Sequence, residues 1–265
     1  MSRRFCLILL GVQISLLSSS AFAAEEGRLE KMVDRITPSI VQVGVATGTM
    51  EVSTVGSGVV VSANGYILTA KHNITGAAHV FVKTSTGTVC PALFYVADAH
   101  RDIALIKAQC KRLTPIAVSK REPLRGEEIL ALGFPASNMI QGTRDEASVS
   151  KGIVSGVNRA IREPRKLEDG EYGDDSNIQP KGWFLREGSS DGSSSLYVES
   201  LIQIDAMVNP GSSGGALVNT NGELLGIILS QITNTGSNVG MNFAISVKEA
   251  ALLLAFSGAS SGGNR

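Results

Sequence analysis

The sequence predicts an all-β chain made of two similar β units in tandem, with a short helix at each end. Runs rich in branched aliphatic residues form two series of about six strands each, and a charged, proline-containing stretch at residues 119–125 separates them. An Asn-Gly pair lies between two runs in each series, at Asn64–Gly65 and at Asn221–Gly222. Because such pairs favour tight hairpin turns, both units are expected to form antiparallel sheets.

The first unit is expected over residues 24–119. It opens with a short amphipathic helix, because apolar residues recur at helical spacing from Arg28 to Ile36 before Thr37–Pro38 ends the pattern. Its strands are expected at residues 39–46, 56–62, 66–70, 79–84, 89–96 and 102–108.

A connector is expected at residues 120–126, and the second unit follows over residues 127–256. Ser246 and Glu249 have the spacing of a capping box, which predicts a terminal helix at residues 250–256 before Gly258. Residues 257–265 are rich in glycine and serine and are expected to be disordered. The strands of this unit are expected at residues 128–133, 147–157, 197–204, 215–219, 223–230 and 239–245.

The first 23 residues are typical of a secretory signal peptide. Arg3 and Arg4 precede an apolar run at residues 5–17, and Ala21-Phe22-Ala23 forms a small-residue cleavage site. A membrane anchor is the alternative, but the run is shorter than the roughly 20 residues that a spanning helix needs. We therefore expect an exported protein, periplasmic or extracellular in a bacterium, with no membrane span in its mature form.

The charge balance argues against a nucleic-acid partner. Removal of residues 1–23 leaves 242 residues and takes two arginines from the 24 basic residues, so 22 basic residues face 24 acidic ones. A nearly neutral chain lacks the excess of positive charge that phosphate backbones require.

Two cysteines, Cys90 and Cys110, remain after the signal peptide, and an oxidising compartment permits them to pair. Each lies ten residues from His100. If residues 89–96 and 102–108 form a hairpin that turns near His100, the two cysteines face each other. We predict a disulfide, with two separate thiols as the alternative.

Residues 209–216, Asn-Pro-Gly-Ser-Ser-Gly-Gly-Ala, form the most informative segment. A serine between glycines can serve as a nucleophile, because glycines let the backbone approach a substrate closely. The amide groups of Gly211 and Ser213 could then both point at a developing oxyanion. An ordinary surface turn is the alternative, and the partners of the serine must decide between the two.

A nucleophilic serine needs an imidazole to take its proton and a carboxylate to orient the imidazole. Of the three histidines, His72 follows the end of a predicted strand, whereas His79 and His100 lack such a setting. Asp102 directly precedes an apolar strand, and Asp98 is the weaker rival.

With these residues in place, the sequence resembles the HtrA (Deg) family of exported, chymotrypsin-fold serine proteases. The resemblance implies two six-stranded antiparallel β-barrels with the site between them, His72 as general base, Asp102 as its orienter and Ser213 as nucleophile. It runs from about Leu29 to Phe256. The matching segments are residues 56–60, 65–72, 102–106, 152–155, 202–206, 209–217 and 221–227.

The sequence departs from this family at several points. Ser212 stands where the family usually has asparagine, and we expect no C-terminal PDZ domain in this chain. Trypsin-like digestive proteases resemble the chain less, because they need an aspartate where Ser212 stands. The segment at residues 162–195 is longer than usual and includes Trp183-Phe184-Leu185; it either gates activity or binds a partner, or is a tolerated insertion.

The resemblance also implies a specificity pocket walled by residues that precede the nucleophile and by the strand near residues 228–230. Met207, Val208, Ile228 and Ser230 are expected there, without an acidic group, so small or medium apolar side chains should be preferred. Alternatively, Met207 and Val208 fill the core of the second barrel.

The sequence thus predicts a serine endopeptidase that cleaves peptide bonds of unfolded or misfolded proteins through an acyl-enzyme. Neither metal nor cofactor is expected, and the resemblance makes a homotrimer reasonable. A catalytically silent binding module or chaperone-like adaptor is the alternative.

Overall fold

The computed structural model describes residues 27–46, 52–135, 146–162, 197–231 and 241–258. The predicted signal peptide, the segment expected at 162–195 apart from Arg162, and most of the predicted tail lie outside these ranges. The chain divides after Ile36 into two units. Residues 27–36, which lie before this division, are helical, as the sequence predicted for residues 28–36.

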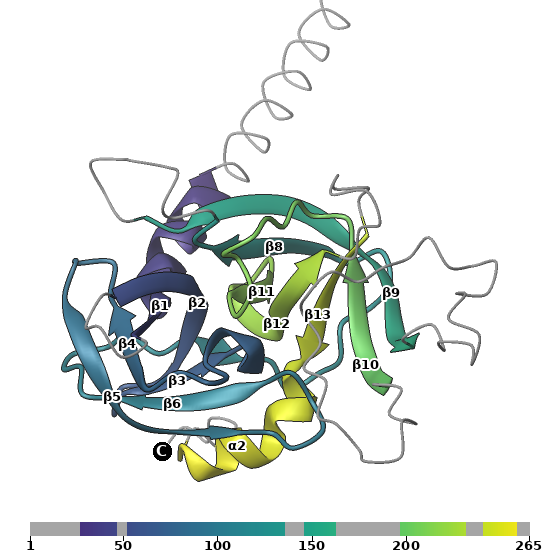
Figure 1. The fold of residues 1–265 in the computed structure, drawn as a ribbon. Helices are drawn as coiled ribbons and strands as arrows, with labels where there is room; N and C mark the ends of the chain where they lie inside the picture. Colours follow the sequence, from purple (N-terminus) through teal and green to yellow (C-terminus); the bar gives the residue numbers. More distant parts are fainter. Residues whose placement is uncertain (1–26, 47–51, 136–145, 163–196, 232–240, 259–265) are drawn as a thin grey trace, which may run out of the picture. The chain divides into compact units, whose positions relative to one another are not determined.

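The strands from Ile40 to Ala108 form a closed antiparallel β-barrel, the first barrel (Figure 1). Its strands pair in the order β1-β2-β3-β6-β5-β4, and inward-facing valines and isoleucines such as Val43, Val60 and Ile106 form its core. Short 3-10 turns precede β1 and follow β3, at Thr37–Ser39 (η1) and Lys71–Asn73 (η2). The strands are β1 (Ile40–Ala46), β2 (Val52–Ser62), β3 (Tyr66–Thr69), β4 (His79–Lys83), β5 (Val89–Ala97) and β6 (Ala104–Ala108).

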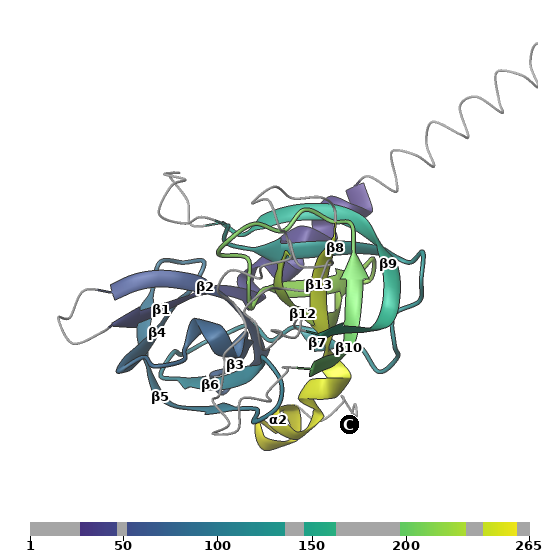
Figure 2. The same cartoon turned by 45° about the vertical axis from the view of Figure 1, so that its right-hand side comes forward.

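The strands from Glu128 to Ser246 form another six-stranded antiparallel barrel, the second barrel (Figure 2). Its order is β11-β8-β9-β10-β13-β12, and the pairing of β11 with β12 closes it. A short additional strand, β7 (Ala117–Val118), pairs in parallel with β12. The core of this barrel is separate from that of the first and includes Ile129, Ile204 and Leu225. The strands are β8 (Glu128–Gly133), β9 (Ser148–Arg162), β10 (Tyr197–Ile204), β11 (Ala216–Asn219), β12 (Glu223–Gln231) and β13 (Asn242–Ser246).

The observed strands follow the sequence prediction closely, and the differences have local causes. Strand β6 begins at Ala104 instead of Asp102, and the carboxylate of Asp102 accepts a hydrogen bond from the backbone N–H of His72. Strand β9 continues to Arg162, beyond the predicted end at residue 157. Strand β7 has only two residues, too few for any periodicity to appear in the sequence.

The chain returns to the first barrel at its C-terminal end. A 3-10 turn, η3 (Val247–Ala250), leads into helix α2 (Ala251–Phe256). The side chain of Ser246 accepts a hydrogen bond from the backbone N–H of Lys248, one residue earlier than the expected capping box. The Phe256 ring packs edge-on against Tyr66 and Phe94, with ring centroids 6.2 Å apart in each case. These aromatic contacts attach α2 to strands β3 and β5, beneath which it lies in Figure 1.

The stretch between the barrels, where the connector was predicted, carries an ion pair. Arg121 Nη1 donates to Glu127 Oε2 at 2.9 Å, and Arg121 Nη2 lies 2.5 Å from Glu127 Oε1. The hydrogen bond from Arg121 lowers the pKa of Glu127. Glu127 Oε2 also accepts from the backbone N–H of Leu124 at 2.9 Å, so this carboxylate braces the turn that leads into β8.

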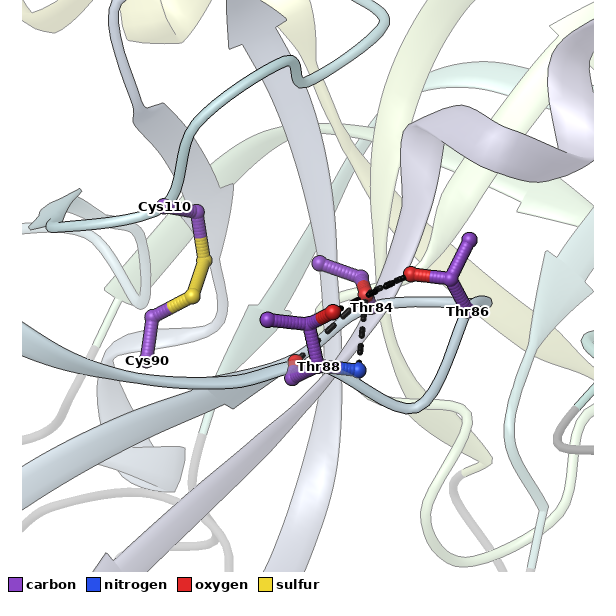
Figure 3. Close-up of a disulfide and its surroundings, with 5 residues drawn as sticks. All are labelled: Thr84, Thr86, Thr88, Cys90 and Cys110. Carbon is purple, nitrogen blue, oxygen red and sulfur yellow. Dashed lines mark hydrogen bonds between the residues drawn. A yellow bond between two sulfur atoms is a disulfide. The ribbon is translucent and has the colours of Figure 1, made fainter.

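Cys90 and Cys110 form a disulfide, with their Cα atoms 5.4 Å apart (Figure 3). Near the hairpin turn, Phe94 pairs with Lys107, a register that would place Pro91 opposite Cys110. The register shifts by one residue between Ala92 and Phe94, and this irregularity brings Cys90 opposite Cys110 instead. The predicted pair of cysteines therefore meets through a β-bulge as well as through the hairpin.

Three threonines, Thr84, Thr86 and Thr88, close the turn that leads into β5 through mutual hydrogen bonds.

Removal of this disulfide should destabilise the protein. The bridge closes a sequence separation of 20 residues, and constraint of an unfolded chain by such a loop stabilises the folded state by about 3 kcal/mol. The double variant Cys90→Ala/Cys110→Ala should therefore lose about 3 kcal/mol in free energy of unfolding, measured by urea denaturation with circular dichroism. Reduced wild-type protein should match the double variant, and equal stability of the oxidised and reduced wild type would contradict the prediction.

Candidate active site

Strand pairing brings the predicted base and its carboxylate to the same edge of the first barrel. Thr69, the last residue of β3, pairs with Ala104, the first residue of β6. The chain beyond the end of β3 and the chain before the start of β6 therefore lie side by side. His72 is in the η2 turn that follows β3, and Asp102 lies two residues before the start of β6, so 30 residues of sequence separation become direct contact.

Asp102 holds His72 through both of its carboxylate oxygens. His72 Nδ1 lies 2.6 Å from Asp102 Oδ2, and the backbone N–H of His72 donates to Oδ1 at 2.8 Å. The side chains are only 6% and 10% exposed, so water competes little for this contact. A neutral imidazole that donates from Nδ1 has Nε2 as its proton acceptor, which is the arrangement a general base requires.

The other candidates for these roles lie elsewhere. The Oδ1 atom of Asp98 accepts from the backbone N–H groups of His100 and Arg101, so this aspartate caps the turn between β5 and β6. His79 is exposed at the start of β4, and His100 is exposed in the turn. The structure therefore brings Asp102, and not Asp98, to His72.

Ser213 lies in the turn between β10 and β11 of the second barrel and is 5% exposed. Its hydroxyl donates a hydrogen bond to the carbonyl of Leu229 on β12. A serine hydroxyl has a single proton to donate. Transfer of that proton to His72 therefore requires the hydroxyl to turn away from Leu229.

The backbone carbonyl of Ser213 is held by the first barrel. It accepts from the backbone N–H of Ser57 at 2.8 Å and from the side-chain amide of Asn73 at 2.9 Å. Asn73 directly follows His72, so one amide side chain ties the turn of the base to the backbone of the serine. Gly56 makes room for this amide, because a Cβ atom at position 56 would lie 2.3 Å from Asn73 Nδ2. The sequence interpretation missed Asn73, whose only signal was its position next to His72.

The turn that contains Gly211 and Ser213 is stabilised by backbone hydrogen bonds around these two residues. The N–H of Ser212 donates to Asn209 at 2.9 Å, and the N–H of Gly214 donates to Ile228 at 2.7 Å. None of the described carbonyl groups accepts from the N–H of Gly211 or of Ser213. Both amides predicted to bind an oxyanion are thus left out of the hydrogen bonds that hold the turn.

Gly214 is required for both its conformation and its lack of a side chain. Its φ is +86°, in the left-handed region that glycine adopts without strain. A Cβ atom at this position would lie 2.1 Å from the carbonyl oxygen of Ser57 and 2.5 Å from Thr69 Oγ1. The absence of a side chain at Gly214 therefore allows the serine turn to contact strand β2 directly.

The residues predicted to wall the pocket divide into two environments. Val208 and Ile228 are 1% and 0% exposed and belong to the core of the second barrel. Met207 is 64% exposed, and its carbonyl accepts from the hydroxyl of Ser150 at 2.6 Å. Ser230 lies on β12, where it pairs with Phe243 of β13. Of the three residues whose side chains are described, only Met207 is exposed to solvent.

Substitution of Gly214 should be far more damaging than substitution of Gly126, which has nearly the same φ of +84° but where an added Cβ atom would meet nothing within 4 Å. Gly126→Ala should cost about 1 kcal/mol of unfolding free energy through backbone strain alone. Gly214→Ala should cost at least about 2 kcal/mol more because of steric overlap. Equal losses in urea denaturation would contradict the predicted contact between the turn and β2.

Two antiparallel six-stranded barrels, with the His–Asp pair on one and a glycine-flanked serine on the other, define the chymotrypsin-like class of fold. A family model for the trypsin-like peptidase domain matches residues 56–227. The chain belongs to the trypsin-like peptidase family, within its HtrA (Deg) branch.

Two relatives and one solved structure show the extent of the similarity. A probable periplasmic serine endoprotease DegP-like of Pseudomonas putida is 31% identical over 198 residues, 74% of this chain and 33% of that protein. The serine endoprotease DegS of Haemophilus influenzae is 33% identical over 201 residues, 75% of this chain and 48% of that protein. The crystal structure of the serine endoprotease from Yersinia pestis aligns with a TM-score of 0.62 and 29% identity, covering 86% of this chain and 66% of that one.

The chain thus spans between a third and a half of the length of these two relatives. No helix among the described residues is long and apolar enough to cross a membrane. The described residues also contain no group of three or more His, Cys, Asp or Glu side chains arranged to hold a metal ion.

Proposed function

We propose that the protein is an exported serine endopeptidase in which Ser213 is the nucleophile, His72 the general base and Asp102 the residue that orients it. The observation that carries the proposal is the buried pair of His72 and Asp102, 2.6 Å apart, whose turn is joined to the Ser213 carbonyl through Asn73. Membership of the trypsin-like peptidase family supports it independently.

The geometry supports an acyl-transfer mechanism. The Ser213 hydroxyl turns from the Leu229 carbonyl and attacks the peptide carbon of the substrate as Nε2 of His72 takes its proton. Asp102 stabilises the imidazolium that forms, since one of its oxygens faces Nδ1. The N–H groups of Gly211 and Ser213 bind the negatively charged oxygen of the tetrahedral intermediate. His72 then protonates the leaving amine, and water hydrolyses the acyl-enzyme by the reverse sequence of proton transfers.

In the proposed resting state, the hydrogen bond to the Leu229 carbonyl holds the Ser213 hydroxyl against the second barrel. It also motivates the alternative function, a catalytically silent binding module, in which the hydroxyl stays there. The peptidase requires the hydroxyl to rotate away from Leu229, whereas in the silent binding module it stays there.

Covalent labelling distinguishes these two functions. A fluorophosphonate probe should label the wild-type protein, Ser213→Ala should abolish labelling, and His72→Ala should slow it by at least about 10³-fold because the hydroxyl loses its base. Ser53→Ala, which removes an exposed hydroxyl on β2, should label like the wild type. Folded wild-type protein that forms no adduct would favour the silent binding module.

The substrate class is proposed from the surroundings of the nucleophile and from the family. Met207 presents an exposed apolar side chain two residues before the turn, and the buried Val208 beside it anchors this segment in the core. We place Met207 at the side chain of the substrate residue that precedes the cleaved bond, where it favours small or medium apolar groups. Unfolded or misfolded proteins of the bacterial envelope are the proposed substrates, and a relative described as periplasmic supports the location.

This preference can be tested with peptide esters that differ only in that residue. Alanine and valine esters should exceed lysine and arginine esters in kcat/KM by at least about 10²-fold, because an apolar side chain packs against the Met207 thioether, whereas a cation that a bound substrate covers there would be desolvated without an acidic partner. Met207→Asp should narrow this difference, and Leu124→Asp, which places a carboxylate at another exposed site, should not. Faster hydrolysis of the lysine and arginine esters by the wild type would overturn the proposed preference.

A further inference from the structure

Ser57 is a fully buried polar residue of the first barrel whose hydroxyl forms its hydrogen bonds with the second. It lies on β2 and has 0% exposure. Its hydroxyl donates to the carbonyl of Gly211 at 2.7 Å and accepts from the backbone N–H of Phe134, just beyond β8, at 2.8 Å. One hydroxyl thus joins β2, the end of β8 and the serine turn.

The bond to Gly211 falls on the peptide group between the two amides proposed to bind the oxyanion. The carbonyl of the Gly211–Ser212 peptide accepts from Ser57, and its N–H donates to Asn209 at 2.9 Å. Because a peptide group is planar, holding both ends fixes its orientation. The N–H of Gly211 belongs to the preceding peptide and that of Ser213 to the following one. The position of this peptide therefore sets the relative direction of both donors.

Gly211 makes such a restraint necessary. Its φ is +94°, and a glycine exchanges between backbone conformations more readily than any other residue. If its peptide rotated, the two N–H groups would no longer converge. The hydrogen bond from the Ser57 hydroxyl to the Gly211 carbonyl opposes this rotation.

The site is shaped for a serine. A Cβ atom at Gly133 would lie 3.1 Å from Ser57 Oγ and 3.0 Å from the Cα of Ser212, so the surroundings of the hydroxyl are tightly packed. The backbone of Ser57 makes separate contacts: its N–H donates to Ser213 and its carbonyl accepts from Thr69 Oγ1 at 2.7 Å. Substitution by alanine would remove the hydroxyl and leave these backbone contacts in place.

We infer that Ser57 is a positioning residue for the proposed hydrolysis: its hydroxyl orients the Gly211–Ser212 peptide and thereby aligns the two oxyanion donors. The inference rests on the proposed function of Ser213. It assigns to Ser57 no contact with substrate, so its loss acts on the transition state and not on substrate binding.

The variant Ser57→Ala should lower kcat for a peptide ester by about 10-fold to 100-fold with KM nearly unchanged, a smaller loss than removal of an oxyanion donor itself. Ser119→Ala is the matched control, because Ser119 is also buried and its hydroxyl also makes two hydrogen bonds, both to the backbone of Arg121. It should leave kcat unchanged. Ser57→Cys, which restores a weak donor of similar shape, should recover part of the lost rate. All variants are compared at a temperature where unfolding curves show them to be fully folded.

Amide hydrogen exchange over residues 209–215 provides a measurement that does not depend on catalysis. Ser57→Ala should speed exchange in this segment, and Ser119→Ala should not. Unchanged exchange together with unchanged kcat would overturn the inference while the proposed function stands. A wild-type protein without hydrolysis or labelling would overturn the proposed function, and the exchange rates would still decide whether Ser57 holds the turn.

Discussion

The carbonyl group of Ser213 is the point on which the arrangement of the site depends. It accepts from the backbone of Ser57 and from the side chain of Asn73, both in the first barrel, while its own residue belongs to the second. Each barrel has its own hydrophobic core, and hydrophobic packing is not directional. Burial alone would hold the barrels together without fixing how the serine turn lies against the first barrel. The hydrogen bonds to this carbonyl oxygen, together with the bond from the Ser57 hydroxyl to Gly211, are directional and fix that placement.

The polar groups around this carbonyl are buried, which makes each of them costly to leave unpaired. Thr69, Ser57 and Asn73 are all at most 5% exposed and are linked through hydrogen bonds to one another or to the serine turn. The members of such a network depend on one another. Removal of one side chain leaves its buried partners without a hydrogen bond, and water does not reach them to replace it. The glycines at positions 56, 133 and 214 belong to the same arrangement, since a side chain at any of them would enter the network or the turn.

The His72–Asp102 pair is built on a different principle from the serine turn. Its two members lie just outside the paired ends of the neighbouring strands β3 and β6 of one barrel, so the sheet itself brings them together. Ser213, in contrast, reaches the site through contacts across the two barrels. In the structure, the Ser213 hydroxyl bonds to Leu229 of its own barrel, while His72 and Asp102 contact each other directly. In the proposed function, the group that moves before the reaction is the Ser213 hydroxyl, and the turn that carries it is held by hydrogen bonds.

The sequence by itself determined the order along the chain of the described strands other than the two-residue β7, because alternation of apolar residues and Asn-Gly turns are local signals that survive in any context. It also predicted a catalytic triad of His72, Asp102 and Ser213, which stays a proposal, and it identified the cysteine pair from hairpin geometry. Only the tertiary structure decided that a β-bulge sets Cys90 opposite Cys110, that Val208 and Ile228 pack into the core, and that Ser57 and Asn73 hold the serine turn. These outcomes depend on register shifts and on contacts between segments up to 154 residues apart, for which no local pattern of residues carries a signal.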